Sequence, residues 1–258
     1  MDWTGFKKEV FKLTTIDLDA YKEKQMKRRI DSLIAKHSVP SYDEYAKKLS
    51  SDKDYFEEFV NFLTINVSEF YRNPPQWKVL EEEMLPELMS KFGNRLKIWS
   101  AACSTGDEPY TLVMVLADHI PMSNIKIIAT DIDNVVLSKA QAGLYNKKSV
   151  AGLPQKYIDK YFTKIGDNSY KISDEVKKCV EFKKHDLLKD PYPKDCHMIV
   201  CRNVLIYFTD ECKNDIFKKF NQSLVKEGIL FVGSTEQMMQ CKTLNYDSKK
   251  SFFYQKIQ

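Results

Sequence analysis

Glycine is scarce in this sequence, and its scarcity limits the ligands that the chain is expected to bind. There are 8 glycines among 258 residues, and no G-x-G-x-x-G pattern occurs. Turns that hold NAD or FAD are rich in glycine because their backbone amides must approach a pyrophosphate closely. The turn after the first predicted parallel strand contains one glycine, Gly106. The sequence therefore disfavours a nicotinamide- or flavin-dependent oxidoreductase.

Metal-binding and disulfide patterns are also missing. The 6 cysteines form no C-x-x-C pair, and the 4 histidines form no H-E-x-x-H pattern. Zinc sites need closely spaced ligands of these types, and disulfide frameworks need an oxidising compartment. We therefore expect no metal, and free, mostly buried thiols in a reducing cytoplasm.

Long apolar runs and strong charge are lacking as well. Apolar stretches such as residues 112–116 are too short to cross a bilayer, and residues 1–10 contain no apolar core of a signal peptide. The net charge of +4 is too small to indicate a nucleic-acid-binding protein. We expect a globular cytoplasmic protein that neither inserts into a membrane nor binds nucleic acid.

Two consecutive strand-turn-helix patterns lie at the centre of the chain. A short apolar run at residues 98–99 gives way to small residues, after which Glu108 and Pro109 open a helical pattern. A β-branched run over residues 124–130 ends at Asp131 and is followed by a second helical pattern. Two βα units this close predict a parallel, doubly wound α/β sheet, which binds ligands at the carboxyl ends of its strands.

The carboxylates at these strand ends suit S-adenosylmethionine, which carries adenosine but no phosphate. Asp131 is placed to accept hydrogen bonds from the ribose hydroxyls, and Glu108 is placed to accept one from the methionine ammonium. Alternatively, the two residues act only as strand-end and helix-cap carboxylates. Their spacing supports both interpretations equally.

Residues 1–73 are predicted to form a helical N-terminal domain and linker, followed by an α/β domain over residues 74–258. Asp19 is expected to cap a helix whose exposed faces are mainly basic and include Arg28 and Arg29. This helix is either an ordinary solvated surface or a docking surface for an acidic macromolecular partner.

Three further features of the chain bear on its organisation. The linker carries polar side chains that must lie against an apolar domain, where a ligand is one possible partner for them. Between about residues 150 and 180, short β patterns around a Gly-Asp-Asn turn predict a small β-subdomain insert. A helix from Thr209 is expected to stop at Gly228, and a final antiparallel strand is expected over residues 251–257.

Five motifs, taken in order, resemble those of the CheR-type chemoreceptor methyltransferases. They are residues 64–72 (TINVSEFYR), 99–110 (WSAACSTGDEPY), 129–133 (ATDID), 201–208 (CRNVLIYF) and 230–236 (LFVGSTE). The resemblance implies methyl transfer from S-adenosylmethionine to glutamate side chains on the cytoplasmic helices of chemotaxis receptors, with S-adenosylhomocysteine as the other product. It also implies a small helical domain followed by a Rossmann-like class I methyltransferase domain with a β-subdomain insert.

The resemblance also implies roles for particular residues. Carried over position by position, the cofactor contacts fall on Asn66, Ser68, Arg72, Glu108, Asp131, Asp186, Leu187, Arg202 and Asn203. The active-site arginine and tyrosine of the family fall on Arg72 and Tyr207. Arg28 and Arg29 of the basic helix are complementary to a receptor helix bundle that presents glutamates.

Two positions depart from the family pattern. Asp186 stands where many members have asparagine, which removes the amide that would contact adenine. The predicted insert has only Gly166 and lacks the glycine-rich loop of members that dock on a receptor's C-terminal pentapeptide. The chain therefore resembles the members that work without this tether.

A glutamate carboxylate is already ionised at neutral pH, so its methylation needs orientation and desolvation rather than a general base. Arg72 is expected to orient the substrate carboxylate or the methionine carboxylate, and Tyr207 to hydrogen-bond nearby. Structural roles for both side chains are the alternative. Rival functions are a methyltransferase acting on RNA or a small molecule, and a catalytically silent S-adenosylmethionine-binding signalling module.

Overall fold

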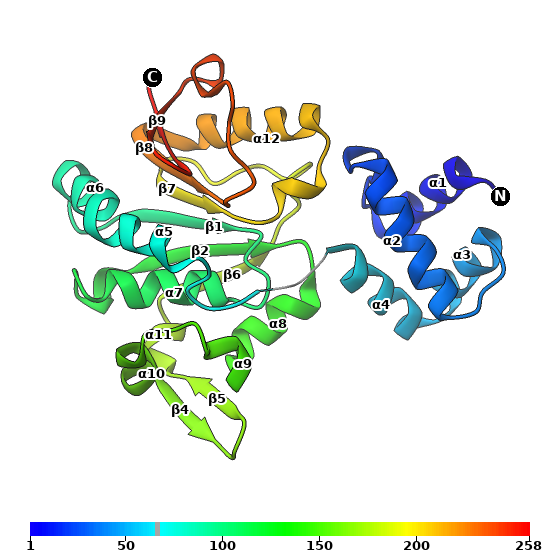
Figure 1. The fold of residues 1–258 in the computed structure, drawn as a ribbon, viewed down its shortest axis with the longest axis horizontal. Helices are drawn as coiled ribbons and strands as arrows, with labels where there is room; N and C mark the ends of the chain where they lie inside the picture. Colours follow the sequence, from blue (N-terminus) through cyan, green and yellow to red (C-terminus); the bar gives the residue numbers. More distant parts are fainter. Residues whose placement is uncertain (65–67) are drawn as a thin grey trace. The chain divides into compact units, whose positions relative to one another are not determined.

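The structure, a computed structural model, describes residues 1–64 and 68–258. The chain divides into two compact units. The first comprises Met1–Asn66 and Val204–Asp215, and the second comprises Val67–Asn203 and Ile216–Gln258. Both are shown in Figure 1.

The first unit is built from helices, as predicted. They are α1 (Trp3–Thr14), η1 (Leu18–Ala20), α2 (Glu23–Lys36), α3 (Tyr42–Ser51) and α4 (Lys53–Thr64). Phe6, Tyr45 and Phe59 are fully buried at their centre, where the ring of Phe59 meets the other two edge-on at 6.3 and 5.9 Å. These aromatic contacts between α1, α3 and α4 supply much of the unit's apolar core.

The predicted cap of α2 is wrong. The helix begins at Glu23 after Lys22, which makes no side-chain cap, and Asp19 lies in the preceding 3-10 turn, where it pairs with Lys7. The next helix, α3, is capped by Ser41, whose Oγ accepts a hydrogen bond from the Glu44 amide at 3.2 Å.

A segment distant in sequence completes the first unit. It contains the short helix η4 (Leu205–Tyr207) and the start of α12 (Asp210–Ser223). The Lys22 amide donates to the Tyr207 carbonyl, and the Thr209 amide donates to the Ala20 carbonyl, both at 2.9 Å. These bonds anchor the backbone around Tyr207 to the N-terminal end of α2.

The second unit contains a 7-stranded sheet with the strand order β6-β2-β1-β7-β8-β10-β9. Its strands are β1 (Lys97–Ala101), β2 (Lys126–Asp131), β6 (Val180–Lys184), β7 (Cys196–Cys201), β8 (Leu224–Val232), β9 (Tyr246–Lys250) and β10 (Phe253–Lys256). The pairs from β6 to β8 are parallel, and β10 runs antiparallel to both β8 and β9. The predicted doubly wound sheet and its final antiparallel strand are confirmed, whereas β9 was not predicted.

Helices cover both faces of this sheet (Figure 1). The helical segments are α5 (Pro74–Val79), the π-helical η2 (Leu80–Met84), α6 (Leu85–Phe92), α7 (Asp107–Leu116), η3 (Met122–Asn124), α8 (Asn134–Ala142), η5 (Cys241–Leu244) and α12. Successive residues of β1 face opposite ways: Ile98 joins the core formed with α5, α6 and α7, whereas the Trp99 ring packs 5.5 Å from Phe220 of α12. Trp99 is fully buried, and its indole N–H donates to the Thr130 hydroxyl at 2.9 Å.

The helix α12 ends at Ser223, so the predicted stop at Gly228 is wrong. Gly228 lies inside β8, beside the register shift between Cys196 and Met198 on β7. A Cβ at Gly228 would lie 2.9 Å from the Val225 carbonyl oxygen, so the bulged backbone leaves no room for a side chain.

A second, 3-stranded sheet has the order β3-β5-β4, and the hairpin of β4 and β5 is labelled in Figure 1. Its strands are β3 (Leu144–Asn146), β4 (Phe162–Ile165) and β5 (Ser169–Ile172), accompanied by α9 (Lys147–Val150), α10 (Gln155–Tyr161) and α11 (Asp174–Lys177). The predicted hairpin is present, but β3 was not predicted, because a three-residue strand has too short a pattern to recognise. Of the described helices, none is long and apolar enough to cross a membrane.

Candidate functional site

The turn between β1 and α7 has a strained backbone. Ala102, Ser104 and Gly106 adopt positive φ angles of 61°, 49° and 87°, a conformation that costs non-glycine residues energy. The Cys103 amide donates to the Thr130 carbonyl at 2.8 Å, which ties the turn to the end of β2. Strain of this kind persists where surrounding contacts enforce it, which is common at ligand sites.

Asp131 connects this turn to the end of β2. The residue is 6% exposed, and its carboxylate accepts the amides of Ser104 at 2.8 Å and Asp133 at 3.0 Å. Burial raises the pKa of Asp131 to about 6, although both amide hydrogen bonds favour the ionised form. The carboxylate is therefore held at the carboxyl edge of the sheet, where the sequence predicted it.

Glu108 lies at the same edge, on the first turn of α7. Its carboxylate accepts the Ser100 hydroxyl at 2.9 Å and lies 3.7 Å from the Arg202 guanidinium. Burial raises the pKa of Glu108 to about 7, and the neighbouring Arg202 opposes this rise. At neutral pH, a cation placed beside Glu108 would complete its ionisation.

Arg202 follows the last residue of β7, and hydrogen bonds and a ring contact fix its side chain. Its guanidinium donates to the Arg72 carbonyl and to the Gln76 side-chain oxygen, both at 2.8 Å, and packs 4.7 Å from the centre of the Phe231 ring. Burial lowers the pKa of Arg202. Gln76 also donates to the Ser234 hydroxyl at 2.9 Å, so it links the ends of β7 and β8.

A second link between these strand ends is Glu236. Its carboxylate is buried and accepts the amides of Asn203 at 2.6 Å and Gly233 at 2.8 Å. A Cβ at Gly233 would lie 2.3 Å from this carboxylate and 2.9 Å from the Asn203 amide nitrogen, so a side chain there would displace the contact between them. The contacts hold Asn203 in its left-handed conformation, with φ at 63°.

The predicted linker residues fall into two groups. Asn66 lies outside the described residues. Ser68 and Arg72 are half-buried, and the Ser68 hydroxyl hydrogen-bonds to the Asp107 carboxylate, whose pKa is raised by burial. The Arg72 carbonyl also accepts the Trp77 indole N–H at 2.9 Å, which orders the backbone that carries the Arg72 side chain.

Asp186 and Leu187 follow β6 at the same edge of the sheet. The Asp186 carboxylate accepts the Leu188 amide at 2.8 Å, so it stabilises its own turn. Leu187 is buried at 8% exposure and supplies an apolar surface beside that turn. This apolar surface is suited to a flat aromatic ring. The Asp186 carboxylate already accepts a hydrogen bond from the backbone of its own turn.

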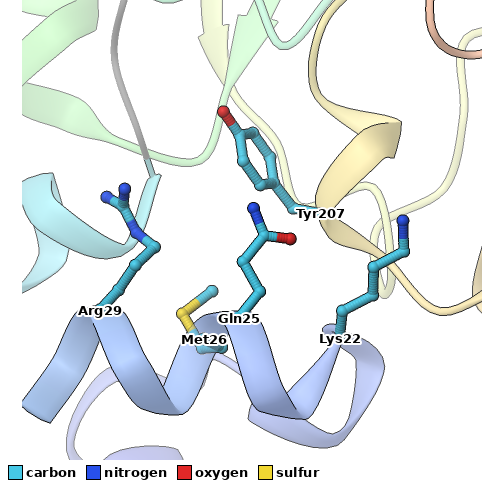
Figure 2. A pocket seen from close by; sticks show the side chains of 5 residues that line it. All are labelled: Lys22, Gln25, Met26, Arg29 and Tyr207. Carbon is cyan, nitrogen blue, oxygen red and sulfur yellow. The ribbon is translucent and has the colours of Figure 1, made fainter.

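The other predicted site residues lie in the first unit (Figure 2). A shallow hollow in the surface is lined by Lys22, Gln25, Met26, Arg29 and Tyr207. The Arg29 guanidinium donates to the Phe62 carbonyl at 2.7 Å and lies 4.5 Å from the Phe62 ring. Arg28, by contrast, is exposed on α2.

The strand-end residues fit S-adenosylmethionine better than a phosphate-bearing cofactor. Two carboxylates with raised pKa values, the buried Asp131 and the partly buried Glu108, would repel a phosphate and attract a cation or ribose hydroxyls. The buried Ser104 hydroxyl has no hydrogen-bond partner among the described residues, so it is available to a polar ligand. Among residues 1–64 and 68–258 there is no group of three or more His, Cys, Asp or Glu that could hold a metal ion.

Three residues of the site, Ser104, Gln76 and Glu236, were not predicted from the sequence. Glu236 ends the recognised motif over residues 230–236, which was an available signal. Gln76 follows two prolines in a helical start and had no such signal, because its importance comes from partners 126 and 158 residues away.

Comparisons with known proteins agree with this geometry. The family described as the CheR methyltransferase, SAM binding domain, matches residues 66–252, and the CheR methyltransferase, all-alpha domain, matches residues 1–64. The "Chemotaxis protein methyltransferase" of Listeria monocytogenes is 39% identical over 253 residues, covering 98% of this chain and 96% of that protein. The protein of the same name from Borreliella burgdorferi is 32% identical over 243 residues, covering 90% and 86%.

These matches cover both units of the chain and name the cofactor for which the strand-end carboxylates are suited. The predicted helical domain, class I methyltransferase fold and S-adenosylmethionine cofactor are confirmed. The chain belongs to the CheR family of chemotaxis methyltransferases, which use S-adenosylmethionine.

Proposed function

We propose that this protein methylates glutamate side chains on the cytoplasmic helices of chemoreceptors, and that it acts in the cytoplasm. The observation that carries the proposal is the group of exposed cations on the first unit, Lys22 just before α2 and Lys24 and Arg28 on it. Carboxylate side chains are the chemical groups that such a surface attracts. An RNA or small-molecule substrate has no comparable support.

The exposed side of α2 extends this surface. Lys22, Lys24 and Arg28 are exposed, whereas Lys27 pairs with Asp31 at 2.8 Å. A helix bundle that presents glutamates is complementary to these exposed cations. Arg28 is therefore proposed to contact the receptor, and Arg29 to shape the hollow from its position against the Phe62 carbonyl.

The strand-end residues are proposed to hold the cofactor, which supplies a methyl group on a sulfonium sulfur. Glu108 would accept the methionine ammonium, Asp131 the ribose hydroxyls, and the Leu187 side chain would contact the adenine. Arg202 and Asn203 would shape the site through their contacts with Gln76 and Glu236.

No residue needs to remove a proton, because a glutamate carboxylate is ionised at neutral pH. Arg72 is proposed to orient a carboxylate, and its backbone is ordered by Arg202 and Trp77. Tyr207 is proposed to hydrogen-bond to the substrate, with its backbone fixed by the start of α2. The remaining requirement is alignment of the carboxylate oxygen with the methyl carbon and sulfur.

We further propose that docking does not need the receptor's C-terminal pentapeptide. The turn between β4 and β5 contains a single glycine, Gly166, with φ at 61° and open space around it. A pull-down with a receptor-tail peptide tests this idea, and tight binding would contradict it.

The decisive experiment uses a chemoreceptor cytoplasmic fragment and S-adenosylmethionine labelled in its methyl group. We expect label in alkali-labile esters on glutamates, located by peptide mapping. Binding of S-adenosylhomocysteine without any transfer would instead favour the silent signalling module, and label on RNA alone would favour the rival methyltransferase.

A further inference from the structure

The small sheet contacts the linker segment that carries two proposed cofactor residues. Phe70, between Ser68 and Arg72, is 1% exposed, and its ring meets Tyr145 of β3 edge-on at 4.7 Å. Its amide donates to the Ser149 carbonyl at 3.3 Å. The backbone next to both cofactor residues is therefore packed against the small sheet and the adjoining α9.

The small sheet also contacts the strained turn after β1. The Tyr145 hydroxyl donates to the Thr105 carbonyl at 2.7 Å, across 40 residues of sequence. Thr105 lies between Ser104, whose amide binds Asp131, and Gly106. A Cβ at Gly106 would lie 3.2 Å from the Tyr145 hydroxyl, so the tyrosine fits closely against the turn.

Tyr145 thus touches both walls of the cofactor site, the linker through its ring and the turn through its hydroxyl. We propose that Tyr145 is a positioning residue for S-adenosylmethionine, which holds the turn after β1 in the conformation that binds the cofactor. Two non-glycine residues of that turn, Ala102 and Ser104, are left-handed, so the turn relaxes when an anchor is removed. Binding the cofactor would then have to restore the strained conformation.

The most direct test is Tyr145→Phe, which keeps the ring packing and removes one hydrogen bond. The loss of a typical hydrogen bond corresponds to roughly fivefold in an equilibrium constant. We expect S-adenosylhomocysteine to bind about fivefold more weakly by calorimetry, and the KM for S-adenosylmethionine to rise similarly. The kcat at saturating cofactor should stay within about twofold of wild type, because the filled site restores the turn.

Tyr170→Phe is the matched control. Tyr170 pairs directly with Tyr145 in the sheet register and is half-buried. Among the described residues, its hydroxyl makes no hydrogen bond to the turn after β1. Its variant loses a hydroxyl from the same sheet and should bind S-adenosylhomocysteine like wild type. Equal weakening in both variants would indicate a general effect on the small sheet and would overturn the proposal.

Amide hydrogen exchange gives a second readout that does not depend on activity or on the stability of a variant. In the wild-type protein, the amides of residues 103–106 and of β3 should gain protection together when S-adenosylhomocysteine binds. Protection confined to the turn would overturn the proposal, as would a Tyr145→Phe variant with lowered stability but unchanged affinity. A wild-type protein that does not bind S-adenosylhomocysteine would refute the cofactor assignment instead.

Discussion

Replacing Glu108 with glutamine is expected to weaken cofactor binding and to stabilise the protein in the absence of cofactor. The Glu108 side chain is 14% exposed, and burial raises its pKa to about 7. Arg202, at 3.7 Å, favours the ionised form but does not offset the loss of solvation. The carboxylate is thus kept in a site that favours its neutral form until a cation binds.

The sign of the stability effect follows from this raised pKa. Between the usual value of 4.5 and the folded value of about 7, the folded protein holds a proton that the unfolded chain has lost. Stability therefore falls as the pH rises from 4.5 to 7, by up to about 3 kcal/mol, and then levels off. Glutamine cannot ionise, so Glu108→Gln should raise the melting temperature by up to about 10 °C at pH 7.5 and leave it nearly unchanged at pH 4.5.

Cofactor binding should show the opposite pH dependence. If Glu108 accepts the methionine ammonium, binding expels a proton from Glu108, and affinity should rise with pH, by at most about tenfold per pH unit below 7. The ligand's own ammonium stays charged up to about pH 7.5, because an α-amino group has a pKa of about 7.7–8.0. Calorimetry with S-adenosylhomocysteine in two buffers of different ionisation enthalpy measures the released proton directly.

Asp131 provides the control for this experiment, because its pKa is also raised, to about 6. Near pH 7, Asp131 is mostly ionised whereas Glu108 is about half protonated, so Asp131→Asn should leave most of the proton release unchanged there. Equal proton release from wild type and Glu108→Gln would refute the assignment of the ammonium to Glu108. An affinity that does not depend on pH between 6.5 and 7.5 would do the same.

Three more predictions concern other parts of the molecule. Arg72→Ala should lower methyl transfer by about 100-fold or more while circular dichroism stays like that of wild type, because a misaligned carboxylate reacts slowly; near-normal turnover would exclude an orienting role. Arg28→Glu should raise the KM for a receptor fragment severalfold at low salt and much less at 0.5 M salt. The control Lys47→Glu makes the same charge change at an exposed position of α3 and should leave this KM unchanged. Glu236→Ala leaves the amides of Asn203 and Gly233 without their acceptor and should lower the free energy of unfolding by about 1–3 kcal/mol in urea titrations. Glu236→Gln keeps one acceptor oxygen and should lower the free energy of unfolding by less.

Much of the fold could be predicted from local patterns. The short apolar run at β1, the β-branched run at β2 and the helical spacing after Glu108 indicated the parallel sheet, because local patterns along the chain favour particular elements. The strand-end position of Asp131 followed from the same pattern, since parallel strands bring their carboxyl ends to one edge. Two strands were not predicted: β3 has only three residues, and β9 (YDSKK) has a single apolar residue and therefore no apolar pattern. The strained turn has no local signature beyond small residues.

The sequence by itself determined the main elements, their order and the family, and its scarcity of glycine disfavoured a dinucleotide-binding turn. The tertiary structure decided which side chains act together: Gln76 with Arg202, Glu236 with Gly233, and Tyr145 with the Thr105 carbonyl. It also decided that burial raises the pKa of Glu108 to about 7. The physical reason is that desolvation and long-range hydrogen bonds depend on what packs around a group in space, which residue order does not specify.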